Sequence, residues 1–306
     1  EALNLLDDRR KSARKQAAAL LAHLQQMKDS TTGQLIGITG PPGAGKSTLS
    51  AALIAVWRQR GQRVGVLAVD PSSPISGGAL LGDRLRLQTS AADDGVFVRS
   101  LANRGQFGGL SAEVWPMSLV LLASFDIVLI ETVGVGQREV DISRMCDTTC
   151  YVAQPGSGDS VQFLKAGILE VPHILVVNKA DMGAVARRTL AELGAVLHRE
   201  HPDGHWQVPV LATSATQGGG IEALADIIEQ HQNELRSRHE LASRRRGYQA
   251  YWIHKRLQEE FGSYGIDQLG GEEALLAKLQ VQDLDLLDYY EALRQRLYQR
   301  FGSSNP

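Results

Sequence analysis

The segment GPPGAGKS, from Gly40 to Ser47, constrains the fold of this chain more than any other feature. It matches the pattern G-x-x-x-x-G-K-[ST] and lies between an apolar run, Leu35–Thr39, and a predicted helix, Ser47–Arg60. Its glycines let the backbone turn tightly with positive φ and approach phosphate oxygens. Successive N–H groups and the start of the helix then hold negative charge. The segment therefore predicts a site for the phosphates of a nucleoside triphosphate.

The residues of this phosphate loop have distinct expected roles. Lys46 reaches the β- and γ-phosphates and is a candidate catalytic residue, and the Ser47 hydroxyl is a candidate ligand of Mg²⁺. We expect the whole segment to contact the nucleotide through Gly40, Pro41, Pro42, Gly43, Ala44, Gly45, Lys46, Ser47 and Thr48.

Short apolar runs alternate with helical patterns after Gln34, which is typical of parallel βαβ units. Several runs are almost wholly apolar, as expected for strands buried on both faces. The predicted strands are Leu35–Thr39, Val64–Val69, Val96–Arg99, Ile127–Ile130, Thr149–Ala153, Ile174–Val177 and Val208–Ala212. The predicted helices are Ser47–Arg60, Gly109–Ser124, Ser160–Leu169, Ala184–Arg199 and Ile221–Glu240. We therefore expect a three-layer α/β domain with a mostly parallel sheet over residues 31–235.

Helical patterns flank this domain on both sides. Residues 1–30 form a predicted N-terminal segment, with one amphipathic helix over 1–28. Residues 236–306 form a predicted helical region, with a helix at Leu241–Phe261, a loop at Gly262–Gly271 and two further helical segments. Because short helices cannot bury so many apolar positions alone, we expect this region to pack on the α/β domain or on a second copy.

A second motif, Asn178-Lys179-Ala180-Asp181, follows the predicted strand Ile174–Val177. A carboxylate at Asp181 accepts hydrogen bonds from guanine N1–H and the exocyclic amine, whereas adenine offers neither donor on that edge. We expect the Lys179 stem to cover the base and Asn178 to brace the phosphate loop. The motif therefore predicts GTP and GDP as the nucleotides.

The segment after the last predicted strand supports the same base. We expect a backbone N–H of this segment to meet guanine O6, with contacts from Ser214, Ala215 and Thr216.

Acidic residues near other strand ends predict a Mg²⁺ site. Glu131 follows Ile127–Ile130, Asp70 follows Val64–Val69, and Asp83 lies in the glycine-rich stretch 76–84. Together with Ser47, these carboxylates form a set of oxygen ligands that phosphate oxygens and water complete.

The segment after Glu131 carries the candidate γ-phosphate contacts. Gly134 is placed to donate its backbone N–H to the γ-phosphate. The water-positioning Gln of Ras-type GTPases is absent, because Val135 occupies that position and Gln137 comes two residues later. Glu131 and Gln137 join Lys46 as candidate catalytic residues, and we expect slow intrinsic hydrolysis that a partner accelerates.

The motifs in their joint order resemble the MeaB/ArgK GTPases, the methylmalonyl-CoA mutase-associated members of the SIMIBI class. The matching segments are VDPSSP at 69–74, GDRLRL at 82–87, ETVGVGQ at 131–137, QPGSGD at 154–159 and NKAD at 178–181. The resemblance implies a GTP-hydrolysing chaperone that gates adenosylcobalamin loading and protects or reactivates methylmalonyl-CoA mutase. It also implies homodimerisation through the C-terminal helices.

The same resemblance implies roles for particular residues. Ser47, Asp70, Asp83 and Glu131 take the roles on the Mg²⁺ side. Residues 154–165 match a third switch loop that faces the mutase, and Lys165 matches its functional lysine.

Composition bears on partners and location. The net charge of −2 gives no indication of a nucleic-acid or membrane partner, and no apolar run is long enough to span a bilayer. Two cysteines, Cys146 and Cys150, fit a reducing compartment, so we expect a cytoplasmic protein, or a mitochondrial matrix protein in a eukaryote.

Three alternatives remain open from the sequence. The ArgK name suggests a protein kinase linked to amino-acid transport, although no acceptor-orienting motif is found. A metal-delivery GTPase would need a Cys/His site, for which Cys146 and Cys150 are the only thiols. An ATP-driven dimeric switch of the MinD type would not depend on Asp181.

Overall fold

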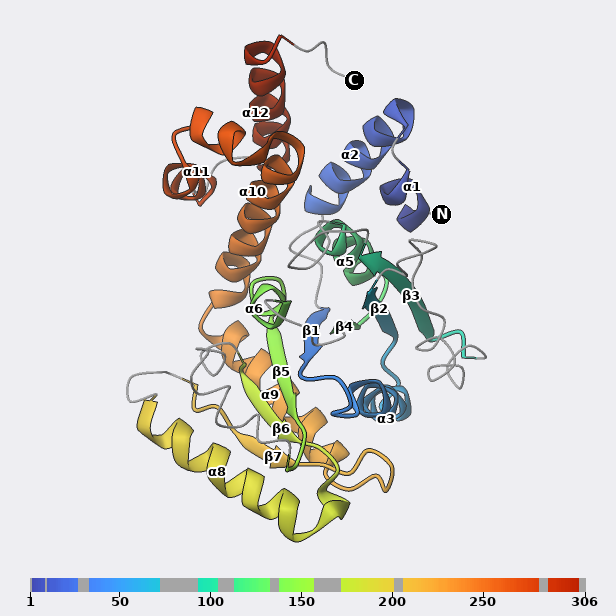
Figure 1. Ribbon diagram of the computed structural model, residues 1–306. Coiled ribbons are helices and arrows are strands. Elements are labelled where there is room, and N and C mark those ends of the chain that lie inside the picture. The colour runs from blue at the N-terminus through green and yellow to red at the C-terminus, as the bar shows by residue number, and fades with distance from the viewer. Residues whose placement is uncertain are drawn as a thin grey trace. The chain divides into compact units, whose positions relative to one another are not determined.

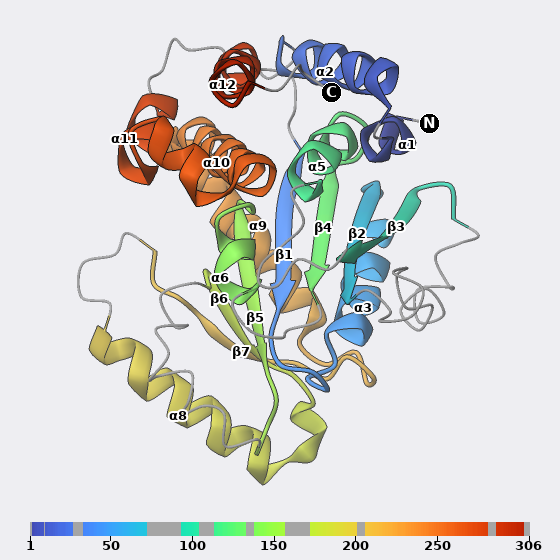
Figure 2. The same cartoon turned by 45° about the horizontal axis from the view of Figure 1, so that its top comes forward.

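The computed structural model describes residues 2–8, 10–26, 33–71, 93–103, 113–132, 138–156, 172–200, 206–280 and 286–302. The chain divides into two compact units. One, the helical unit, contains residues 1–31, 112–123 and 239–306, and the other, the α/β unit, contains residues 32–111 and 124–238. Figures 1 and 2 show the helices and strands of both units.

The α/β unit is built on a seven-stranded sheet in the order β3-β2-β4-β1-β5-β6-β7. The strands are β1 (Gln34–Thr39), β2 (Val64–Pro71), β3 (Val96–Asn103), β4 (Ile127–Thr132), β5 (Thr148–Ala153), β6 (Ile174–Val177) and β7 (Val210–Ala212). Every pair of neighbouring strands that the structure describes is parallel. The strand order reverses at β1, and ligands of such sheets bind outside the carboxyl ends of the strands at that point.

Helices cover both faces of this sheet (Figure 2). They are α3 (Lys46–Gln59), α6 (Arg138–Ser143), the 3₁₀ turn η4 (Ala180–Met182), α8 (Ala184–Glu200) and α9 (Ile221–Ser237). Val152 and Val176 share a buried core with α3 and α9. Tyr151 and Val177, the alternate positions of the same strands, pack with α8 on the other face. The predicted three-layer α/β fold is therefore confirmed.

Gly37 in β1 shows how closely one helix approaches the sheet. A Cβ atom built on Gly37 would lie 2.7 Å from Cγ1 of Ile142 in α6 and 2.9 Å from Sγ of Cys146. A side chain at this position would therefore displace α6, so the sequence has glycine in the middle of a buried strand.

The helical unit contains α1 (Ala2–Asp7), α2 (Lys11–Gln26), α5 (Val114–Leu122), α10 (Glu240–Gln268), α11 (Glu272–Leu279) and α12 (Leu286–Arg300). Helix α5 contacts α1, α2 and α10, although it lies between β3 and β4 in the sequence. Trp115 of α5 makes an edge contact with Tyr248 of α10, with ring centroids 5.7 Å apart. The domain boundaries 1–30, 31–235 and 236–306 stay a prediction.

Several predicted element ends are wrong. One helix was predicted over 1–28, but the structure has two, α1 ending at Asp7 and α2 beginning at Lys11. The chain leaves the helix between them because the Asp8 carboxylate accepts a hydrogen bond from the N–H of Arg10. The predicted helix Ile221–Glu240 ends at Ser237, because His239 takes a left-handed conformation with φ of 57° before α10 begins. The predicted strand Val208–Ala212 begins only at Val210, after Pro209.

Other predicted ends differ from the structure as well. Strand β3 continues to Asn103, beyond the predicted Arg99. The predicted helix Gly109–Ser124 begins, within the described residues, at Val114 and ends at Leu122. The predicted helix Ser160–Leu169 lies outside the described residues.

The loop predicted at Gly262–Gly271 is also wrong. Helix α10 continues to Gln268 with a kink at Gly262, where φ is 67° and ψ is −177°. Helix α12 bonds to both sides of this kink. Arg294 contacts Glu260 before it, and Nη1 of Arg300 donates to the backbone O of Gln268 after it at 2.9 Å. The backbone therefore leaves helical geometry at Gly262, where the predicted helix ends, but a second helical stretch follows in place of the predicted loop.

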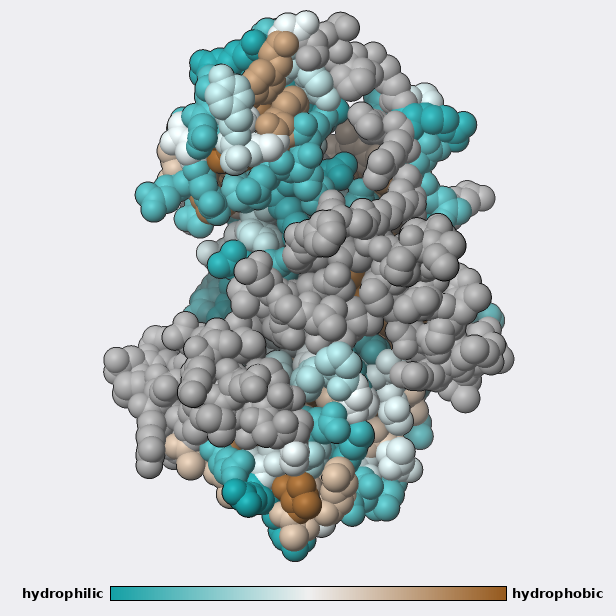
Figure 3. Space-filling model, in the orientation of Figure 1, coloured by the Kyte–Doolittle hydropathy of each residue, from teal (hydrophilic) through white to brown (hydrophobic). Residues whose placement is uncertain are grey.

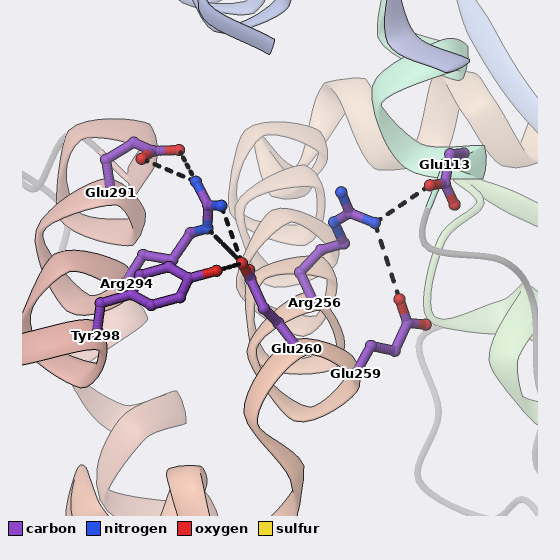
Figure 4. A network of polar contacts seen from close by, with 7 residues as sticks. All are labelled: Glu113, Arg256, Glu259, Glu260, Glu291, Arg294 and Tyr298. Atoms are coloured by element: carbon purple, nitrogen blue, oxygen red, sulfur yellow. Dashed lines mark hydrogen bonds and ion pairs between the residues drawn. The ribbon is translucent and has the colours of Figure 1, made fainter. Parts of the chain in front are cut away.

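A network of charged side chains joins α5, α10 and α12 within the helical unit (Figure 4). Arg256 donates to Glu113 at 3.2 Å. Arg294, whose side chain is 12% exposed, contacts Glu260 at 2.8 Å, and the hydroxyl of Tyr298 donates to the same carboxylate at 2.5 Å. Burial alone would raise the pKa of Glu260. The hydrogen bonds from Arg294 and Tyr298 and the two nearby guanidinium charges outweigh burial and hold that pKa below its ordinary value of 4.5.

This lowered pKa predicts acid sensitivity of the helical unit. A carboxyl whose pKa is lower in the folded state stabilises the fold above its unfolded pKa and loses that contribution as the pH falls through the folded pKa. We expect the free energy of unfolding to fall below about pH 4.5 and the Glu260→Gln variant to be less stable than the parent at pH 7 by about 1–3 kcal/mol. Urea unfolding between pH 3 and 7 measures both. The more exposed Glu291→Gln is the control, with an expected loss below about 1 kcal/mol. Equal acid sensitivity of the parent and Glu260→Gln would contradict this role of Glu260.

None of the described helices combines the length and the hydropathy that crossing a bilayer requires. The face shown in Figure 3 is mainly hydrophilic over the described residues, with small hydrophobic groups of atoms between the polar ones. Among the described residues, the large apolar side chains with the greatest exposure are Phe97, Met182, Val185, Tyr264 and Phe301.

Candidate nucleotide-binding site

The phosphate loop connects β1 to α3 and lies directly on the end of the sheet. A Cβ atom on Gly40 would be 2.2 Å from the backbone O of Val152 in β5, and one on Gly45 would be 2.6 Å from Nδ2 of Asn178. The φ angles of Gly40, Gly43 and Gly45 are 140°, 80° and 88°, a region that favours glycine. These positions therefore need glycine for both close approach and backbone conformation.

Lys46 at the start of α3 folds back over this loop. Its Nζ donates to the backbone O of Gly40 at 2.8 Å and to the backbone O of Pro41 at 2.9 Å, and the residue is only 7% exposed. A positive charge is thus held against the loop, next to a helix N-terminus that carries partial positive charge itself. Both features favour a polyanion at this place.

Ser47 and Glu131 meet beside the loop. Oγ of Ser47 donates to Oε1 of Glu131 at 2.5 Å, and the two residues are 8% and 6% exposed. A buried hydroxyl and carboxylate in contact are the hard oxygen ligands that Mg²⁺ prefers, so these residues fit a magnesium ion. The backbone of Asp70 lies at the same edge, near the end of β2, which pairs with β4. Asp83, the fourth predicted ligand, lies outside the described residues.

Asn178 connects the phosphate loop to the segment after β7. Its Nδ2 donates to the backbone O of Ala44 at 3.0 Å, and its Oδ1 accepts from Oγ1 of Thr213 at 3.2 Å and from the N–H of Ala215 at 3.3 Å. The side chain is 2% exposed, so these bonds are made away from water. The interaction with Thr213 was not expected from the sequence; the tripeptide Thr213-Ser214-Ala215 is the signal that could have indicated it.

The candidate guanine contacts Lys179, Asp181 and Ser214 lie close together. Lys179 takes a left-handed conformation with φ of 60°, and Asp181 in the following turn is exposed. Oγ of Ser214 donates to Oδ1 of Asp181 at 2.6 Å, and the N–H of Ala180 donates to the backbone O of Thr213. The carboxylate and the segment after β7 are therefore held together, as a site for one base requires. Ala215 and Thr216 continue this segment, with Thr216 exposed.

Four candidate residues lie outside the described part of the chain. They are Asp83, Gly134, Gln137 and Lys165. Their roles stay predictions, as do the nucleotide contacts assigned to the described residues, including the exposed Pro42 and Thr48.

The described residues bring two chemical functions to one edge of the sheet. The loop with Lys46 suits the phosphates, and the carboxylate of Asp181 suits a base with two donors. A site of this construction at the point where a parallel sheet reverses its strand order defines a P-loop nucleoside triphosphatase.

The sequence comparison gives the family. The pattern of the methylmalonyl-CoA mutase-associated GTPase MeaB matches residues 1–265. The chain belongs to the MeaB family, and it is a GTPase that binds GTP and GDP and hydrolyses GTP to GDP and phosphate.

Known proteins similar to this chain agree with the family. A Pyrococcus abyssi protein named as a GTPase is 46% identical over 230 residues, which are 74% of this chain and 68% of that protein. The mouse protein named methylmalonic aciduria type A homolog, mitochondrial, is 36% identical over 229 residues, 73% of this chain and 55% of that protein. The crystal structure of a LAO/AO transport system kinase has a TM-score of 0.68 at 24% identity, covering 99% of this chain and 92% of that one. This last similarity shows the fold alone.

Proposed function

We propose that this GTPase is a chaperone that gates adenosylcobalamin loading and protects or reactivates methylmalonyl-CoA mutase. The observation that carries the proposal is the family match over residues 1–265, whose description includes association with that mutase. The mouse relative, named after methylmalonic aciduria, supports the same client. A chaperone of this kind needs a site whose occupancy changes with GTP hydrolysis, and the phosphate loop with Ser47 and Glu131 supplies the residues for one.

In this proposal the chain's own residues bind and orient the triphosphate. Lys46 and the loop N–H groups neutralise the β- and γ-phosphates, and Asp181 orients the guanine. Ser47 and Glu131, with Asp70 and Asp83, hold Mg²⁺, which when bound neutralises the charge that develops on the phosphates. Gly134 contacts the γ-phosphate, and Gln137 and Glu131 orient water. Lys165 links hydrolysis to the mutase.

The test is nucleotide-dependent interaction with a purified methylmalonyl-CoA mutase. We expect the complex to differ in affinity between a nonhydrolysable GTP analogue and GDP, because a ligand shifts an equilibrium only through different affinities for its states. We also expect the mutase to accelerate hydrolysis, and Lys165→Ala to keep GTP binding while losing that acceleration. No binding in either nucleotide state would contradict the proposal, and transfer of the γ-phosphate to a protein instead of water would favour the kinase alternative.

Burial of the two cysteines bears on the metal-delivery alternative. Burial raises the pKa of both Cys146 and Cys150, and the thiolate is the form that binds metals. Both thiols are therefore poor ligands for a transferred metal ion, which favours the mutase role.

Exposed aromatic residues of the helical unit support a homodimer. Tyr264 is 63% exposed and Phe301 38% exposed, with ring centroids 5.7 Å apart, and the rings of Phe261 and Phe301 lie 6.1 Å apart. An aromatic group of this kind is typical of the centre of a protein interface. We propose that a second copy of the chain covers it.

Replacing Tyr264 with Asp is expected to weaken this dimer by about 30-fold or more, because truncating a central aromatic residue typically costs at least about 2 kcal/mol. Sedimentation equilibrium measures the dissociation constant. Met182→Asp, at a 46% exposed side chain of the α/β unit, is the control and should leave it unchanged. A monomeric parent, or an unchanged constant for Tyr264→Asp, would contradict the proposed interface.

The remaining proposals concern location and partners. We propose a cytoplasmic protein, or a mitochondrial matrix protein in a eukaryote, without a nucleic-acid or membrane partner. The name of the mouse relative supports the mitochondrial case.

A further inference from the structure

Gln154, the first residue after β5, lies against the middle of the phosphate loop. A Cβ atom built on Gly43 would lie 3.3 Å from Oε1 of Gln154, closer than an ordinary van der Waals contact. Gly43 has a φ of 80°, and a glycine has more backbone freedom to lose than any other residue. The end of the Gln154 side chain therefore lies beside the backbone of Gly43, on the side where another residue would carry its Cβ atom.

The residues after Gln154 fasten it to α8. Pro155 is buried, and the N–H of Gly156 donates to Oγ1 of Thr189 at 3.4 Å. A Cβ atom on Gly156 would lie 2.9 Å from Cγ1 of Val185, so the backbone of Gly156 lies directly on this helix. Gln154 is thus held between strand β5 on one side and a helix contact on the other, which fixes the base of its side chain.

Strand β5 also supports the beginning of the loop. The backbone O of Val152 contacts Gly40 so closely that no side chain fits there. The loop therefore meets β5 or its continuation at two places, Gly40 and Gly43, while Asn178 bonds to it at Ala44. Of these supports, only the one at Gly43 comes from the Gln154 side chain. A substitution of Gln154 can remove it and leave the buried hydrogen bond from Asn178 to Ala44 in place.

We propose that Gln154 is a positioning residue that supports Gly43, so that the N–H groups of the phosphate loop keep the orientation needed to bind phosphate. The proposal rests on the proposed placement of the phosphates on residues 40–48. Without the side chain, the loop samples more conformations before binding, and the nucleotide must restrict them. The cost appears in affinity, whereas the bound state and its hydrolysis step are little changed.

The test compares Gln154→Ala with Gln154→Met, which keeps a side chain of similar length. We expect Gln154→Ala to raise the KM for GTP and the dissociation constant for GDP about five- to tenfold, the effect of releasing about one residue's backbone freedom. We expect kcat to stay within about twofold, and Gln154→Met to recover most of the affinity. Unchanged affinity in Gln154→Ala, a loss confined to kcat, or a Met variant as weak as Ala would overturn the proposal.

Two further variants separate this role from a general loss of structure. Gly43→Ala should cost less affinity in the Gln154→Ala background than in the parent, because the close contact with Oε1 is then gone. Gln207→Ala, at an exposed glutamine, should leave KM and kcat unchanged. Additive effects of the Gly43 and Gln154 substitutions would count against the contact. If Lys46→Ala leaves nucleotide affinity unchanged, the proposed placement of the phosphates is wrong. If Lys46→Ala weakens nucleotide binding but Gln154→Ala does not, only the role of Gln154 is overturned.

Discussion

Replacing Asp181 with Asn should lower the affinity for GTP about a hundredfold and raise the affinity for xanthosine triphosphate. Guanine presents two donors, N1–H and the exocyclic amine, to the carboxylate, and each bond to a charged acceptor contributes about 1.5–3 kcal/mol. Xanthine has a carbonyl oxygen in place of the amine, and the Asn amide can donate to it. The short bond from Ser214 to Asp181 holds this side chain in position for either base.

Competition between fluorescent GDP and unlabelled GTP, xanthosine triphosphate or ATP measures this change in specificity. Ser214→Ala is the matched control: it removes the bond that orients Asp181 and should cost only about tenfold, with GTP still preferred. Equal binding of GTP and ATP by the parent, or an Asp181→Asn variant with unchanged preference, would contradict the guanine assignment.

Replacing Lys46 with Ala should reduce kcat/KM for GTP by a factor of about 10³ or more. The ammonium lies on the loop at Gly40 and Pro41 and is almost fully buried, so its interaction with the phosphates is weakly screened by water. Removal of a preorganised charge aimed at developing charge typically costs 10²–10³ or more in rate. A loss of this size, together with weaker GDP binding, would agree with contacts to both phosphates.

Phosphate release under single-turnover conditions measures the effect. Lys46→Arg keeps the charge but not the compact shape of the ammonium, so it should recover binding better than hydrolysis. Thermal unfolding of the nucleotide-free variants controls for the loss of the bonds to Gly40 and Pro41. An Ala variant with normal hydrolysis would contradict the role of Lys46.

The sheet and the phosphate loop could be predicted from the sequence because both depend on local patterns of residues. The apolar runs of β1, β4 and β5 are short, nearly continuous and separated by helical stretches, a pattern that few other folds produce. The glycines at 40, 43 and 45 follow β1 directly, and each has a positive φ in the structure. In both cases residues close together in the sequence determine the backbone conformation, so the spacing of apolar residues and glycines is enough to predict it.

What the sequence did not reveal depends on contacts between distant residues. The backbone does leave helical geometry at Gly262, but the helical stretch that follows it to Gln268 was not predicted, and α12 contacts both stretches through Arg294 and Arg300. Helix α5 lies between β3 and β4 in the sequence, and only the structure shows that it contacts α1, α2 and α10. Gln154 is an ordinary strand-to-loop residue in the sequence, and only the fold brings its side chain to Gly43.

A crystal structure with Mg²⁺ and a nonhydrolysable GTP analogue tests the central claim most directly. We expect the phosphates to accept hydrogen bonds from backbone N–H groups between Gly43 and Thr48, with Lys46 on the β- and γ-phosphates and the Asp181 carboxylate on guanine N1 and the exocyclic amine. Density for the analogue at any other place, or an Asp181 carboxylate directed away from the base, would contradict the account.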